Sequence, residues 1–361
     1  MLVVGCHRSG TSAVTGALVA LGLQGVAPAD RMDDSASNPE HWESLGAALY
    51  AEDLLVDLGG AWDAPPSVTD EPLGPVPGIV RPDPLDILAT AYPAPGPRVW
   101  KDPRACLLLP YWRAVLPGPL AAVFVWREPL AVARSLRTRD GIALADGLAL
   151  WERYNRSAAA GLQGLDTYVL DYAGLLDDPG AALADVAGWL GGLRQLAPAA
   201  ASWEVDAAAA SIDRRLRHET AEEADLATGL PVDHRAMADW LDAHAGPHQP
   251  LTSTPPAATS PWPEAVLADR REIAGLRREL ERSGIELADA ARGHAEVLAL
   301  LEALLATREQ QLAVARSERD GERMRYEGVR TELDRMRAST SWTVTAPLRA
   351  AMRRLRRSNS Q

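Results

Sequence analysis

The chain begins with the stretch MLVVGCHRSGTS, in which an apolar run ends at a glycine and a short polar, basic loop leads into a helical pattern. A strand that turns through glycine into a helix points backbone N–H groups and the positive end of the helix dipole at one place. This predicts an anion site, to which Thr11 and Ser12 add hydroxyls and Arg8 adds a charge. The alternative is that Ser9 and Gly10 only cap the helix, and the loop alone leaves both interpretations open.

The loop is close to the phosphate-binding loop of nucleotide triphosphatases but departs from it at one position. Thr11 stands where the pattern G-x-x-x-x-G-K-[ST] requires lysine. This disfavours a kinase, which would also need a magnesium-binding aspartate at a strand end. The sequence shows neither a Cys/His zinc pattern nor a carboxylate cluster with metal-ligand spacing, so no metal is expected.

Short β-rich runs alternate with amphipathic segments up to about residue 245, as in βα units around a parallel sheet. The expected fold class is α/β, a P-loop-like open parallel sheet flanked by helices, followed by a long C-terminal helix or coiled coil. Gly22 is expected to end the first helix. The expected strands are 2–5, 98–101, 121–127 and 167–171.

Arg127 ends the third expected strand, at the carboxyl edge where open α/β sheets bind ligands. Pro129 fits the first turn of the helix that follows, and Ser135 lies two turns further on. Arg127 and Ser135 are therefore candidates to hold one phosphate together. A serine on the helix surface without a ligand is the alternative for Ser135.

The C-terminal third changes character. Residues 246–263 have the proline, serine and threonine content of an extended linker, which predicts a domain boundary. The pattern of residues 264–338 predicts a coiled coil, or else a solvated long helix that frays in part. Residues 339–361 are expected to be a basic tail. Glycines 284, 293, 321 and 328 interrupt the pattern. The heptad seam is approximated by Ile273, Leu276, Leu280, Leu287, Val297, Leu301 and Leu304.

The composition of the chain limits the kinds of partner and the cellular location that can be expected. The formal net charge of −12 argues against a general nucleic-acid binder but leaves room for a local anion pocket. The two cysteines, Cys6 and Cys106, lie in apolar runs and predict buried free thiols in a reducing compartment. The reducing compartment makes a cytoplasmic location the expectation. No apolar run approaches the roughly 20 residues that span a bilayer, so no membrane-spanning segment is expected.

The segments GCHRSGTS and REPLAVARS together resemble the sulfotransferases that use 3′-phosphoadenosine 5′-phosphosulfate (PAPS). In that family a loop of the form G-x-x-[KR]-[SG]-G-T holds the 5′-phosphosulfate and an R-x7-S spacing holds the 3′-phosphate. The stretches NPEHWES, KDPRACLLLPYW, LWERYN and VLDYAGLLDDPGAAL resemble a bacterial branch of the family in the same order. The resemblance implies that PAPS is held by Arg8, Ser9, Gly10, Thr11, Ser12, Arg127 and Ser135.

The resemblance also implies the catalytic roles. Arg8 would neutralise the bridging oxygen as the sulfuryl group leaves. The acceptor hydroxyl needs a base, and related enzymes use glutamate or histidine. In NPEHWES, Glu43 aligns best, His41 is second and Glu40 third, while a favourable acid in a helix first turn is the alternative for Glu43. Lys101 is a further hypothesis, since it is the only lysine of the chain and ends an expected strand.

The expected function is transfer of a sulfuryl group from PAPS to a hydroxyl. The terminal STSWTVTAPLR resembles a tail of bacterial glycosyltransferases and other enzymes of cell-surface polysaccharide assembly, which suggests a carbohydrate or glycolipid acceptor. The helix over 264–338 would then self-associate or bind a partner helix, and the basic tail could touch the inner face of a membrane. A non-catalytic nucleotide-binding scaffold that acts through this helix is the alternative.

Overall fold

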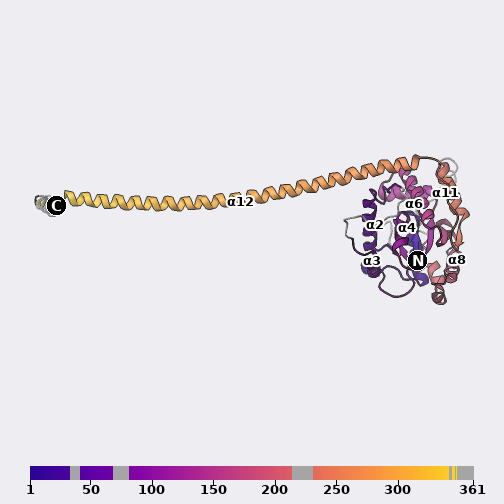
Figure 1. Ribbon diagram of the computed structural model, residues 1–361. Helices are drawn as coiled ribbons and strands as arrows, with labels where there is room; N and C mark the ends of the chain where they lie inside the picture. Colours follow the sequence, from indigo (N-terminus) through magenta and orange to yellow (C-terminus); the bar gives the residue numbers. More distant parts are fainter. Residues whose placement is uncertain (33–40, 68–80, 214–230, 341–343, 346, 348–361) are drawn as a thin grey trace. The chain divides into compact units, whose positions relative to one another are not determined.

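A five-stranded sheet organises the first part of the chain in the computed structural model (Figure 1). The structure describes residues 1–32, 41–67, 81–213, 231–340, 344–345 and 347. The strand order is β2-β1-β3-β4-β5, with the first four strands parallel and β5 antiparallel to β4. The strands are β1 (Leu2–Val4), β2 (Trp100–Lys101), β3 (Ala121–Trp126), β4 (Asp166–Asp171) and β5 (Gly246–His248).

Buried side chains alternate along the strands between two cores, one on each face of the sheet. In β3, Phe124 belongs to one core, whereas Val123 and Val125 belong to the other. The first core packs against α2 (Leu45–Asp57), α4 (Ala105–Val115), α5 (Pro129–Asp140), α6 (Leu144–Gly161) and α11 (Val232–Ala243), with α3 (Pro84–Ala91) beside α2. The second packs against α1 (Thr11–Leu21), α7 (Tyr172–Asp177), α8 (Pro179–Gly192) and α9 (Val205–Ala210). Short 3-10 turns cover Pro28–Asp30 and Ala197–Ser202.

The predicted α/β layout is confirmed. All four expected strands form, and each differs from its predicted range by no more than two residues at either end. Gly22 ends α1 with a φ of 124°, a conformation that glycine adopts without a Cβ penalty. Pro129 begins α5, where the Glu128 carboxylate accepts hydrogen bonds from two backbone N–H groups. Cys6 and Cys106 are buried free thiols.

The prediction that residues 246–263 form an extended linker is wrong. Its first residues form β5, and Leu251 is fully buried and exchanges backbone hydrogen bonds with residues 164 and 165. The Asp233 carboxylate accepts from both N–H and hydroxyl of Thr259 and from the N–H of Ser260. The prediction was based on how little apolar surface the segment can bury. Hydrogen bonds with the rest of the chain hold the segment in place instead.

The C-terminal helix, α12 (Trp262–Ala338), runs without a break through the glycines at 284, 293, 321 and 328. Its first turns belong to the compact unit Met1–Arg278. Leu267 is buried there, and Arg270 pairs with Asp63 at 2.7 Å and with Asp146 at 2.6 Å. The second unit is Glu279–Gln361. Within the described ranges, no helix is long and apolar enough to cross a membrane. Most of the expected basic tail lies outside the described residues.

Candidate functional site

The loop between β1 and α1 passes close to two neighbouring elements. A Cβ on Gly5 would lie 2.3 Å from the carbonyl oxygen of Val125 on β3. A Cβ on Gly10, whose φ is +90°, would lie 2.2 Å from the ring of Tyr172 at the start of α7. Arg8 also has a positive φ of 70°, which is uncommon for a side chain other than glycine. The two glycines therefore hold the loop on a path that no larger residue could follow.

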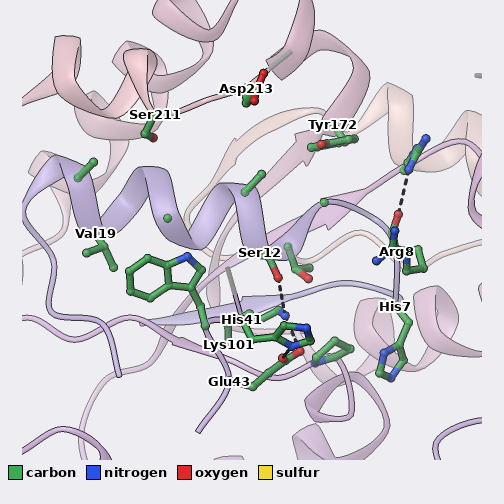
Figure 2. Close-up of a pocket in the computed structure, with 18 of the residues that line it drawn as sticks. His7, Arg8, Ser12, Val19, His41, Glu43, Lys101, Tyr172, Ser211 and Asp213 are labelled. Atoms are coloured by element: carbon green, nitrogen blue, oxygen red, sulfur yellow. Dashed lines mark hydrogen bonds and ion pairs between the residues drawn. The ribbon is translucent and has the colours of Figure 1, made fainter. Parts of the chain in front are cut away.

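Gly10 is the N-cap residue of α1, so the positive end of this helix lies at the loop. A cavity of about 650 Å³ opens beside it (Figure 2). Its size is within the range of about 300–1,000 Å³ that is usual for small-molecule sites. The cavity is lined by His7, Arg8, Gly10, Thr11, Ser12, Ala13, Gly16, Val19, Ala20, His41, Trp42, Glu43, Lys101, Pro103, Arg127, Arg139, Tyr172, Ser211 and Asp213.

Arg8 connects the loop to α5. Its Nε donates to Oγ of Ser135 at 2.9 Å, and Nη1 of Arg127 donates to the carbonyl oxygen of Arg8 at 3.2 Å. The Arg127 guanidinium also lies over the Tyr172 ring, 5.6 Å from its centroid. Burial and the charges of Arg139 and Arg127 lower the pKa of Arg8. Cations crowded in this way favour binding of an anion, which relieves their mutual repulsion.

A second cluster lies on the same cavity, where β2 ends (Figure 2). Nζ of Lys101 lies 2.5 Å from Oε1 of Glu43 and 2.9 Å from Oγ of Ser12. The other carboxylate oxygen of Glu43, Oε2, lies 3.0 Å from Nδ1 of His41. Lys101 and Glu43 are both buried. The cluster therefore links α1, β2 and the segment before α2 through one cation and one carboxylate.

This arrangement determines the charge of Glu43. Burial alone would raise the pKa of Glu43, but the charge of Lys101 and the hydrogen bonds from His41 and Lys101 outweigh it. The pKa is held well below the usual range of glutamate. Glu43 is therefore ionised at neutral pH and is a weak proton acceptor while these contacts last.

His7 lies at the edge of the cavity in an aromatic environment. Its ring centroid is 4.6 Å from that of Trp62 and 5.4 Å from that of Tyr154. Burial and the nearby charges of Arg104 and Arg139 lower the pKa of His7 well below its usual value. Its Nε2 is buried with no hydrogen-bond partner among the described residues. His7 is therefore neutral at neutral pH.

The structure brings most of the predicted site residues to one cavity. Ser135 does not line the cavity itself but is 5% exposed and accepts a hydrogen bond from Arg8, which does. Ser9 does not reach the cavity: its side chain is fully buried, and its N–H donates to the carbonyl of Cys6 at 3.1 Å. Glu40 lies outside the described residues. The predicted residues that line the cavity are Arg8, Gly10, Thr11, Ser12, His41, Glu43 and Arg127.

The sequence offers Lys101 only as a further hypothesis, but the structure places its ammonium at the cavity, in contact with Glu43 and Ser12. Its signal was present, since it is the only lysine and it ends a strand. Arg104, three residues further along, does not line the cavity: its Nε pairs with Glu52 at 2.6 Å and its Nη1 with Asp102 at 3.0 Å. Asp102 also accepts the Arg104 N–H at 2.9 Å, one turn ahead of α4. The helix α4 then begins at Ala105.

Comparison with known proteins finds a weak structural similarity. No protein-family model matches the chain, and no curated protein matches it either. Among solved structures, the chain is similar to the sulfotransferase domain from the Synechococcus PCC 7002 olefin synthase. The identity is 16%, the TM-score is 0.30, and the match covers 74% of this chain and 92% of that chain. A TM-score of 0.30 is too low to carry an argument about function.

Proposed function

We propose that the chain is a sulfotransferase that moves a sulfuryl group from PAPS to a hydroxyl of a carbohydrate or glycolipid. The observation that carries the proposal is the 2.9 Å contact between Nε of Arg8 and Oγ of Ser135. It joins the two segments that resemble the 5′-phosphosulfate and 3′-phosphate sites of PAPS enzymes. Two segments that are 127 residues apart in sequence thus meet beside one cavity.

The donor set suits a ligand with two separate anionic groups. Arg8, Arg127, Arg139 and Lys101 all line the cavity. The resemblance assigns the 5′ end to the loop and the N-terminus of α1, and the 3′ end to Arg127 and Ser135. A helix N-terminus with hydroxyl and guanidinium donors is a general anion site, and a 3′-phosphate distinguishes PAPS from ordinary adenylates.

In the proposed reaction, the acceptor oxygen forms a bond to sulfur while the bond from sulfur to the bridging oxygen breaks. Adenosine 3′,5′-bisphosphate leaves, and the proton of the acceptor goes to a base on the protein. Negative charge grows on the leaving phosphate, so Arg8 and Lys101 are proposed to stabilise it. One such donor is commonly worth about 10²–10³ in turnover.

The proposed base is His41, with Glu43 as the residue that positions it. The sequence favoured Glu43, but its carboxylate is ionised and held by Lys101. A carboxylate that accepts from Nδ1–H keeps an imidazole in the tautomer whose Nε2 takes up a proton. The 3.0 Å contact of Nδ1 with Glu43 supports this division of roles.

The acceptor class is the part of the proposal that relies on the C-terminal resemblance. Trp42 stands between His41 and Glu43 in sequence and also lines the cavity. Its indole packs near Gly25, where a Cβ would lie 2.9 Å from the ring. A large flat apolar side chain next to the proposed base is a suitable surface for one face of a sugar ring.

Calorimetry with adenosine 3′,5′-bisphosphate, AMP and magnesium ATP tests the donor site. We expect the bisphosphate to bind at least tenfold more tightly than AMP. Preference for magnesium ATP would instead indicate a kinase. Transfer of labelled sulfate from PAPS to a glycan or glycolipid extract then tests catalysis, and binding without any transfer would indicate a scaffold.

A further inference from the structure

The helix α12 carries a stripe of large apolar side chains. Seven of these side chains are between 49% and 74% exposed, whereas most large apolar side chains of the sheet and of the helices around it are buried in the two cores. Large apolar side chains that are exposed together along one side of an element commonly mark an interaction site. The members of this stripe, hereafter the α12 seam, are Ile273, Leu276, Leu280, Leu287, Val297, Leu301 and Leu304.

The α12 seam follows a heptad repeat. With Ile273 at position a, the other six side chains fall on a or d positions of consecutive heptads. The remaining a and d positions between 273 and 304 are Ser283, Ala290 and His294. At 1.5 Å per residue the seam is about 45 Å long. This is the pattern by which α-helices pair along a common axis.

We infer that the α12 seam is covered by the same seam of a second copy of this chain, with the two helices parallel and in register. In such a pair, each g position faces the e position five residues further along the partner. Glu272 then faces Arg277, an attractive pair, and Leu300 faces Leu305, an apolar one. The three intermediate pairs combine Glu or Gly with Gly, Ala or Leu, so none sets like charges together.

The end of the seam strengthens the case for a partner. Between 297 and 305, the e and g positions also carry leucine, and Leu298, Leu300 and Leu305 are between 60% and 73% exposed. Apolar side chains at a, d, e and g make a wider face than a two-residue stripe, which a solvated helix would have no reason to keep. His294 at an a position supplies one polar layer, the kind of residue that specifies register.

Sedimentation analysis of the full chain tests association. We expect a mass of at least two chains at micromolar concentration. Leu280→Glu with Leu301→Glu places charges in the seam and should shift the protein to a single chain. The matched control, Ile285→Glu with Ala299→Glu, places the same charges at f positions, away from the seam. It should keep the wild-type mass. Circular dichroism of both variants shows whether the helix persists.

Cysteine cross-linking tests the direction. Ser283→Cys, at a d position, should form a disulfide between two copies on mild oxidation, because parallel in-register helices bring that position next to itself. Arg292→Cys, at an f position and exposed, should stay largely uncrosslinked. Cys6 and Cys106 are buried and so do not interfere. A wild-type protein of single-chain mass would overturn the inference. So would an associated protein in which only the f position cross-links.

Discussion

Nζ of Lys101 lies 2.5 Å from Oε1 of Glu43, in a contact between two buried side chains at the edge of the cavity. The same ammonium donates to Ser12 at the start of α1. The pair therefore fixes the charge of the carboxylate and also places a cation beside the anion loop. Its effects on stability and on turnover can be separated by mutation.

Lys101→Met should destabilise the fold by about 3–5 kcal/mol at pH 7, because it leaves the Glu43 carboxylate buried without its cation. Lys101→Met with Glu43→Gln should recover part of the loss. In the wild type, the depressed pKa of Glu43 contributes stability above the ordinary glutamate pKa of about 4.3, and this is lost as pH falls further. The difference between wild type and Lys101→Met should therefore shrink below about pH 4.3, as chemical denaturation can measure. A double variant less stable than the single one would contradict this account.

The identity of the base can be tested by mutation of the two candidates. If His41 accepts the proton, His41→Gln should lower turnover by about 10²–10⁴. Glu43→Gln should lower turnover less, because it removes the group that positions His41 and leaves the base in place. Calorimetry should show that both variants still bind adenosine 3′,5′-bisphosphate. A fully active His41→Gln variant together with an inactive Glu43→Gln variant would return the role to Glu43.

The 3′-phosphate site should be visible as a difference between two ligands. Arg127→Gln removes a charged donor, and a hydrogen bond to a charged group is worth about 1.5–3 kcal/mol. Affinity for adenosine 3′,5′-bisphosphate should fall about 10–100-fold, whereas affinity for AMP should change little. Arg137→Gln, at an exposed position of α5, is the matched control. Equal loss for both ligands in Arg127→Gln would place the 3′-phosphate elsewhere.

Much of the fold and of the anion loop could be predicted because the signals are local. The strand before Gly5 and the helix after Gly10 follow from apolar periodicity and glycine placement in one short stretch. The strand β5 could not be predicted, since Gly-Pro-His has no strand pattern and forms only because the β4 edge supplies its partners.

The cavity was only partly predictable because its contacts join distant segments. Lys101 and Glu43 are 58 residues apart, and nothing in either neighbourhood shows that they meet. Ser9 was expected to contact the ligand because it lies inside the loop motif. The left-handed turn at Arg8 places it beneath the loop instead, where its side chain is buried.

His7 should make the fold sensitive to mild acid. Burial lowers its pKa, so the unfolded chain takes up a proton below about pH 6.5 that the folded chain does not. Stability should therefore fall by about 1–2 kcal/mol between pH 6.5 and 5. His7→Phe keeps the contacts with Trp62 and Tyr154 and should remove this part of the slope in thermal unfolding. Burial also lowers the pKa of His234, so the part of the slope that comes from His234 should remain. An unchanged slope in His7→Phe would contradict the assignment.

Two glycines with positive φ separate the cost of backbone strain from that of a steric clash. Gly141 at the end of α5 has a φ of 69° and nothing within 4 Å of the point that a Cβ would occupy, so Gly141→Ala should cost only about 1 kcal/mol. Gly10→Ala adds a contact of 2.2 Å with the Tyr172 ring and should cost roughly 3 kcal/mol or more. Denaturant titration of both variants measures the difference. Because Tyr172 also carries Arg127 on its face, Gly10→Ala should weaken binding of adenosine 3′,5′-bisphosphate, whereas Gly141→Ala should not. Equal costs for the two variants would mean that Tyr172 yields to the added methyl group and does not hold the loop in place.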